Sequence, residues 1–87
     1  IEVRTLVTIT SKIKSVLSRY GFSFADYARQ LNIFPQTLNN KAKKNAYKVQ
    51  DLIELGDLTH TELCLRDLET KEVIMTFKKS DLEIGND

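Results

Sequence analysis

Residues 23–44 read SFADYARQLNIFPQTLNNKAKK, and this stretch decides the fold. Its first half carries apolar residues at the spacing of one helix face: Phe24, Ala28 and Leu31. Ser23 precedes them where a helix N-cap is expected. Asn32 follows them, and asparagine readily adopts the left-handed conformation in which many helices end. The pattern predicts a helix over FADYARQL, with Tyr27 flanking its inner face.

A second helix is predicted over PQTLNNKAKK, residues 35–44. Proline suits the first helical position because its missing N–H would have no intrahelical partner there. Leu38 and Ala42 form the only apolar stripe, and the other positions are amides, a hydroxyl or lysines. Most of this helix must therefore face solvent or a polar ligand.

Further helices are expected on either side of this pair. The one before it is capped by Thr10 or Ser11, ends at Gly21 and has this apolar stripe: Ile13, Val16, Leu17 and Tyr20. The one after it spans Lys48–Leu58, with Val49, Leu52, Ile53 and Gly56 at core spacing and Asp51, Glu54 and Asp57 on the outer side. Residues 1–9, IEVRTLVTI, are either a strand or a disordered leader.

Beyond residue 60 the apolar period changes from helical to alternating. The segments ELCLRDL and VIMTFKK flank ETKE, which predicts a two-stranded antiparallel hairpin. Its apolar residues would meet across the strands: Leu63 and Leu65 with Val73, Met75 and Phe77. Ser80–Ile84 would add a final helical turn. The predicted fold class is mainly α with a small β element, with four helices in residues 10–60 and a hairpin extension in residues 61–87.

The net charge of +1 conceals an asymmetry along the chain. From Thr10 to Gln50 there are eight basic residues and one acid, whereas from Asp51 to Asp87 there are ten acids and four basic residues. One interpretation is that the first half faces a polyanion and the second half faces another partner. The other is that both halves are ordinary solvated surfaces.

Composition argues against several classes of protein. No apolar run approaches the ~18 residues of a membrane span, and a single cysteine, Cys64, suits a reducing cytoplasm. His60 and Cys64 have no evident orienting partner, so neither an enzyme, a metal site nor a cofactor is expected. A chain of this length buries only roughly 60% of its unfolded surface, so dimerisation would add to a small core.

Two helices around a tight turn form the helix-turn-helix arrangement. The stretch SFADYARQLNIFPQTLNNKAKKNAYKVQDLIELGDLT resembles the Xre/Cro–repressor family of phage and bacterial DNA-binding domains. The tail TELCLRDLETKEVIMTFKKSDLE looks like the β-hairpin extension of a small subgroup of that family. The matching positions are the small and apolar residues of the motif: Ala28, Leu31, Ile33 and Leu38. The resemblance covers roughly residues 8–83 and implies a helix-turn-helix DNA-binding domain over residues 10–60.

Three positions depart from the family pattern. Asn32 replaces the usual turn glycine, and Phe24 stands where the family often has a glutamine that touches phosphate. Phe34 stands where a serine or threonine normally caps the recognition helix, which weakens that helix by roughly 0.5–2 kcal/mol unless Pro35 compensates.

The resemblance implies that helix 35–44 enters the major groove of double-stranded DNA. Gln36 and Asn40 lie one turn apart, and each amide can pair bidentately with adenine, so these two are expected to read bases. Thr37 and Asn39 border the same surface. Phosphate contacts are expected from Ser23, Lys41, Lys43, Lys44 and Lys48, with Lys12, Lys14 and Arg19 as weaker candidates. The alternative is that all of these are ordinary solvated residues.

Domains of this kind usually bind palindromic operators as two-fold dimers. The expected dimer contact is the apolar stripe of the hairpin: Leu63, Leu65, Val73, Met75 and Phe77. The alternative is a hairpin folded back on its own core. The function predicted is a cytoplasmic transcriptional regulator, a repressor of a phage, plasmid or chromosomal element. The competing hypothesis is a protein-interaction module, antitoxin-like or an adaptor subunit, that binds a partner through the acidic hairpin.

Overall fold

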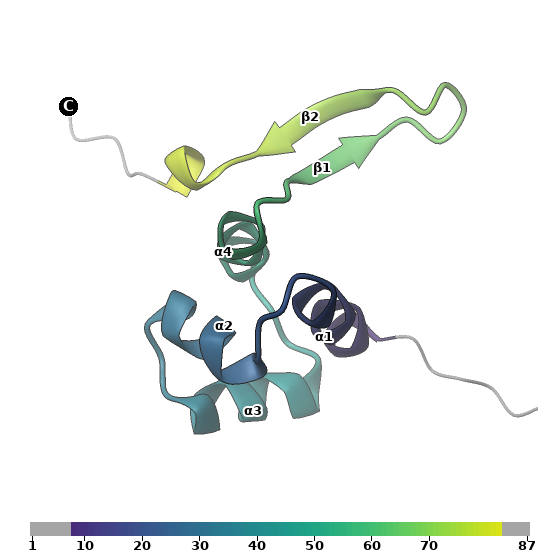
Figure 1. The fold of residues 1–87 in the computed structure, drawn as a ribbon. Helices are drawn as coiled ribbons and strands as arrows, with labels where there is room; N and C mark the ends of the chain where they lie inside the picture. The colour runs from purple at the N-terminus through teal and green to yellow at the C-terminus, as the bar shows by residue number, and fades with distance from the viewer. Residues whose placement is uncertain (1–7, 83–87) are drawn as a thin grey trace, which may run out of the picture. The chain divides into compact units, whose positions relative to one another are not determined.

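The computed structural model describes residues 8–82, which form four α-helices, a two-stranded sheet and a short 3-10 helix (Figure 1). The predicted fold class, mainly helical with a C-terminal antiparallel hairpin, is confirmed. The chain divides into two compact units, and the boundary lies between Tyr47 and Lys48. The fourth helix therefore groups with the hairpin and not with the three helices before it.

The first helix, α1, spans Ile9–Arg19 and starts earlier than the sequence pattern indicates. Its N-cap is Thr8, whose hydroxyl oxygen accepts a hydrogen bond from the Ser11 backbone N–H at 3.1 Å. The Ser11 hydroxyl in turn accepts from the Thr8 backbone N–H at 2.9 Å, which completes a capping box. The expected caps, Thr10 or Ser11, are therefore wrong. Of the segment 1–9, residues 1–7 lie outside the described residues.

The helix-turn-helix pair forms as its local signals predict. Helix α2 spans Phe24–Leu31, is capped by Ser23 and ends at Asn32 in the left-handed conformation, φ 60°. Helix α3 spans Pro35–Lys44, with its proline at the start of the helix and no side-chain cap from Phe34.

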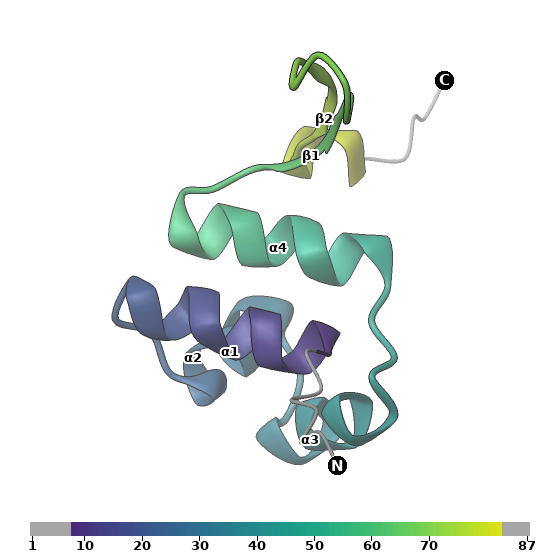
Figure 2. The same cartoon turned by 90° about the vertical axis from the view of Figure 1, so that its right-hand side faces the viewer.

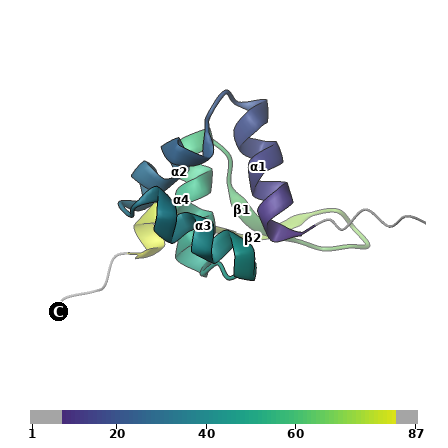
Figure 3. The ribbon, with the colours of Figure 1, turned by 90° about the horizontal axis from the view of Figure 1, so that it is seen from below.

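The core of the first unit draws on all three helices. Its buried apolar residues are Ile13, Leu17, Tyr27, Ala28 and Leu38. Figure 3 shows α3 in front, with α2 and α1 on either side of it. Two aromatic predictions are wrong: Tyr27 is fully buried instead of flanking the inner face, and Tyr20 is 47% exposed instead of belonging to the core. Tyr20 lies at the C-cap of α1, where the helix is already ending.

The second unit begins with α4, Val49–Thr59. Asp51, expected on its outer side, is buried instead, and its carboxylate accepts the Lys48 backbone N–H at 2.9 Å, which caps the start of the helix. Val49, expected at a core position, is 59% exposed. Gly56 is required by a close approach, since a Cβ here would lie 2.8 Å from the backbone oxygen of Thr61.

The hairpin consists of β1, Leu63–Arg66, and β2, Val73–Phe77, and β1 contacts α4 (Figures 1 and 2). The sequence left the strand register open. In the structure Leu63 pairs with Phe77 and Leu65 with Met75, and a bulge after Leu65 makes Arg66 pair with Val73. In the turn, the Asp67 carboxylate accepts the backbone N–H groups of Glu69 and Thr70 at 2.8 and 3.0 Å. A 3-10 helix, η1 (Lys79–Leu82), forms close to the expected final turn.

Lys79 joins η1 to α4 through its ammonium group. Its Nζ lies 3.5 Å from Glu54 Oε1 and 3.6 Å from Asp57 Oδ2. These two carboxylates raise the pKa of Lys79, Glu54 more than Asp57. The ion pairs are on the surface, so they orient the end of the hairpin more than they stabilise it.

Candidate nucleic-acid interface

Helix α3 presents nearly all of its polar side chains to solvent. Leu38 is its one fully buried residue, whereas the four residues predicted to contact bases are all exposed: Gln36, Thr37, Asn39 and Asn40. The Gln36 side-chain amide donates to the Asn40 side-chain oxygen at 3.4 Å, so these two amides do share one face. This long, exposed hydrogen bond leaves most of their donor and acceptor capacity available to a ligand.

An open groove of about 370 Å³ runs between α3 and the start of α1. It is lined by Thr10, Lys14, Gln36, Asn39, Ala42 and Lys43. Lys14 was predicted only as a weaker phosphate contact, because the sequence does not fix which way α1 faces. The structure brings Lys14 to the same groove as two of the amides, with its Nζ 5.0 Å from the centre of the Phe24 ring.

Thr10 fixes the C-terminal end of α3 against α1. Its backbone N–H donates to Asn45 Oδ1 at 3.1 Å, and its hydroxyl donates to the Ala42 carbonyl oxygen at 3.1 Å. The same hydroxyl lies 2.7 Å from the Tyr47 hydroxyl. Asn45 also ends α3 in the left-handed conformation, φ 53°. These contacts join residues more than thirty positions apart, so no local sequence signal could have shown them.

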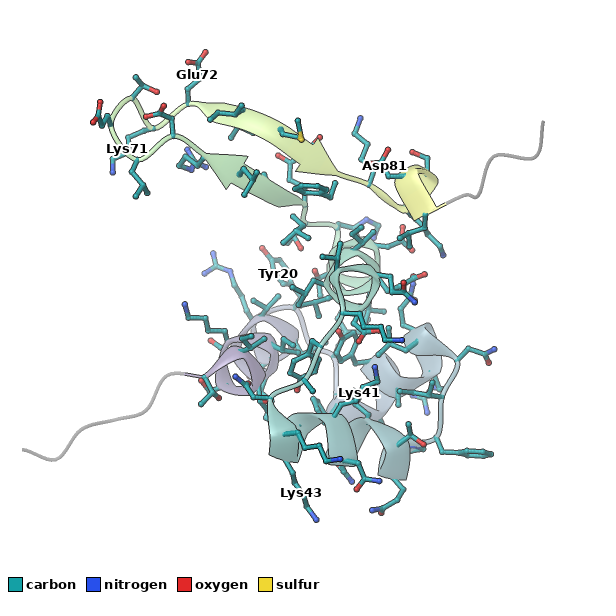
Figure 4. The ribbon with its side chains drawn as sticks, turned by 180° about the vertical axis from the view of Figure 1, so that it is seen from behind. Tyr20, Lys41, Lys43, Lys71, Glu72 and Asp81 are labelled. Atoms are coloured by element: carbon teal, nitrogen blue, oxygen red, sulfur yellow. The ribbon has the colours of Figure 1, made fainter. Side chains whose placement is uncertain are left out.

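The basic residues at the end of α3 differ in how accessible they are. Lys43 and Lys44 are exposed, and Figure 4 shows the Lys43 side chain projecting outward from the helix. Lys41 is half-buried. Lys48, the fourth predicted lysine, begins the second compact unit. Of the three lysines predicted at the end of α3, Lys43 and Lys44 are thus the accessible ones.

Ser23 is the least suited of the predicted phosphate contacts. Its hydroxyl oxygen accepts the Asp26 N–H at 3.0 Å, and its own backbone N–H donates to the Asp26 carboxylate at 2.8 Å. The backbone and hydroxyl hydrogen bonds from Ser23, and then the nearby Arg29 guanidinium, lower the pKa of Asp26. An anionic carboxylate already occupies this helix N-terminus, so a phosphate would have to compete with it.

Phe34 is more conspicuous in the structure than in the sequence. Its side chain is 80% exposed at the N-terminal end of α3, beside a shallow pocket of about 260 Å³ that Arg29, Asn32 and Ile33 also line. In the sequence, Phe34 stands out only as a missing cap. A large exposed aromatic ring next to the exposed amides makes it a further candidate for a ligand contact.

The predicted dimer residues split into two groups. Leu65, Val73 and Met75 are exposed, whereas Leu63 and Phe77 at the base of the hairpin are half-buried. Cys64 is half-buried in β1, opposite Thr76. His60 ends α4 in the left-handed conformation, φ 59°.

Within residues 8–82 no three histidine, cysteine or acidic side chains lie close enough together to hold a metal ion. No helix in this range is long and apolar enough to cross a membrane.

Comparison with protein-family models, with curated proteins and with solved structures finds no match. The functional assignment therefore depends on the residues and geometry described above.

Proposed function

We propose that this protein is a sequence-specific DNA-binding regulator, a repressor, that reads the major groove with α3. The observation that carries the proposal is the outer face of α3, where Gln36 and Asn40 are exposed, adjacent and hydrogen-bonded to each other. Adenine presents an acceptor, N7, and a donor, its N6 amino group, in the major groove, and the N–H and C=O of a glutamine or asparagine amide match them as a pair. The amide must be turned the right way round to do so, and a neighbouring amide helps to orient it.

Electrostatics support the same ligand. The described part of the first unit, residues 8–47, has seven basic residues and one acid, Asp26. Lys43 and Lys44 extend from the C-terminal end of α3, and Lys14 lies at the groove beside it. Lysines at such positions suit phosphate contacts, which fix the register of a protein on DNA, while the amides read the bases.

The proposal implies a palindromic site, two copies of the chain and a cytoplasmic location. One α3 covers only a few base pairs, so two copies related by a two-fold axis are expected on one operator. The resemblance to the Xre/Cro–repressor family, including its mobile-element members, supports this assembly as an expectation.

The test is a selection of bound oligonucleotides from a random pool, followed by affinity measurements with variants. Gln36→Ala and Asn40→Ala should each weaken binding to the selected site by about 1–3 kcal/mol and relax the base preference at one position of each half-site. Gln50→Ala, which removes an exposed glutamine amide from α4, is the matched control and should leave both unchanged. Binding and preference that survive both α3 variants would disprove the base-reading role.

A second function is favoured by one observation, the exposed apolar residues of the hairpin. A protein-interaction module of the antitoxin or adaptor type would bind its partner there. A partner held by apolar contacts should stay bound as salt rises, whereas DNA held through lysines should dissociate.

A further inference from the structure

The outer edge of β2 is an exposed apolar part of the second unit. Of the two strands, β1 packs more closely against α4, and β2 lies on the far side of β1 (Figure 1). Three consecutive apolar residues of β2 are exposed: Val73 at 39%, Ile74 at 64% and Met75 at 53%. An unpaired, apolar strand edge is a template for another strand, and folded proteins usually cover or charge such an edge.

The sheet of the described residues has only two strands, which is fewer than a stable sheet normally needs. Two strands alone are marginally stable in water, and three or more strands, or packing against a helix, are normally required. Here α4 contacts β1, so β2 would gain most from an added strand.

Charges at the two ends of β2 indicate which strand that would be. Glu72 precedes the strand and Lys78 follows it, each one residue outside Val73–Phe77. Among the described residues neither of these side chains has a salt-bridge partner, and Figure 4 shows Glu72 projecting away from the hairpin. A second β2 running antiparallel, with Met75 opposite Met75, would place each Glu72 opposite Lys78 of the other copy.

Other alignments are disfavoured by the same charges. A parallel alignment would put Glu72 against Glu72 and Lys78 against Lys78, and like charges directly opposite are destabilising. Antiparallel alignments shifted by two residues leave Glu72 and Lys78 without opposite charges. Within residues 72–78, where Glu72 and Lys78 are the only charged side chains, the two-fold alignment on Met75 is the antiparallel alignment that forms two ion pairs.

We infer that two copies of this chain join through the outer edges of their β2 strands, antiparallel and centred on Met75, to form a continuous four-stranded sheet. This goes beyond the proposed function and would supply the dimer that function requires, but it does not depend on DNA binding. It also differs from a contact through one face of the hairpin, because Leu63 and Leu65 of β1 take no part in it.

The experiment measures the molar mass of the full chain in solution against concentration, without DNA. The wild-type protein should be a dimer, and Glu72→Lys or Lys78→Glu should each weaken dimerisation by roughly tenfold, since each change places like charges opposite one another twice. The double variant with both changes should restore wild-type dimerisation, because the pairs re-form with reversed sign. Glu69→Lys, in the turn outside the strand, is the control and should have no effect.

Cross-linking tests the register, in a Cys64→Ser background. Met75→Cys should form an intermolecular disulfide under mild oxidation, because directly opposite residues of antiparallel strands have Cα atoms about 4.5–5.5 Å apart. Ile74→Cys should not, because its opposite residue is Thr76. A monomeric wild-type protein, or a dimer that neither responds to the charge reversals nor cross-links through position 75, would overturn the inference. Loss of DNA binding with dimerisation intact would count only against the proposed function.

Discussion

At the scale of single residues, Phe34 is unfavourable for stability in two ways, because it leaves α3 without a side-chain cap and exposes an aromatic ring to solvent. It occupies the N-cap of α3 in an extended conformation, φ −72° and ψ 148°, that a serine or threonine would also adopt, yet it provides no side-chain cap. A position that gives up a cap and exposes an aromatic ring is a candidate for function.

Phe34→Ser should therefore stabilise the protein relative to Phe34→Ala. Both variants remove the ring, but only serine supplies a hydroxyl that accepts a backbone N–H of the first turn of α3. The difference in the free energy of unfolding should be about 0.5–2 kcal/mol, measured by urea denaturation. Equal stabilities of the two variants would show that Pro35 already gives α3 all the N-terminal stabilisation it can use.

The proposed function gives the same ring a ligand to contact. Apolar side chains recognise the methyl group of thymine in the major groove. Replacing the contacted thymine with uracil removes one methyl group and should weaken wild-type binding roughly fourfold. Phe34→Ser should be insensitive to that replacement. Equal sensitivity of the two proteins at every thymine of the selected site would exclude this contact.

Asp26 provides a prediction on pH. Its folded-state pKa is lowered, so its carboxylate stabilises the protein above the ordinary aspartate pKa of about 3.9, and this contribution disappears as pH falls through the lowered value. Asp26→Asn should unfold at a lower temperature than wild type at pH 7, and the gap should close as pH drops below about 4. Glu62→Gln, which makes the same kind of change at an exposed carboxylate outside any capping box, is the matched control.

At the scale of elements, local chemistry was enough to predict most of the first unit. Ser23, Asn32 and Pro35 each act on backbone groups within three or four residues, and each was assigned correctly from the sequence. Thr8 was missed because three hydroxyl residues lie within four positions, Thr8, Thr10 and Ser11, and they look alike as caps. Which hydroxyl caps the helix depends on where the rest of α1 packs.

Contacts that a periodic pattern does not show account for the remaining errors. Asp51 has the spacing of an outer residue, but it is buried, and its carboxylate makes a local capping contact with the Lys48 backbone N–H. The bulge between Leu65 and Arg66 shifts the strand register, and no periodic pattern shows such a shift. At the candidate site, the amides were predictable from their spacing, whereas the groove beside them depends on how α1 packs against α3.

The contact between α1 and α3 leads to a prediction for the site. Thr10→Val keeps the size and shape of the side chain but removes the hydroxyl that contacts Ala42 and Tyr47. The free energy of unfolding should fall by about 1–3 kcal/mol, because a carbonyl and a phenol lose a partner. If α3 must be held rigidly to read bases, DNA affinity should fall as well. Ser15→Ala, which removes a hydroxyl from the exposed side of α1, is the control.

At the scale of the whole molecule, charge is divided along the chain in the same order as the compact units. The described residues of the first unit carry seven basic and one acidic side chain, and those of the second, residues 48–82, carry five basic and eight acidic ones. This division suits a chain in which one unit binds a polyanion while the other makes contacts that do not involve it.

Salt dependence tests that division directly. Each phosphate neutralised by a lysine adds about 0.9 to the negative slope of log affinity against log salt concentration. Replacing both Lys43 and Lys44 with alanine should therefore reduce the slope by roughly 1.8 while leaving the base preference unchanged, because phosphate contacts carry no sequence information. Lys71→Asn in the hairpin turn, which tolerates the positive φ of 66° at that position, should leave the slope as it was. A slope that responds to Lys71 and not to the α3 lysines would place the polyanion on the hairpin, because counterions are released only where phosphates are contacted.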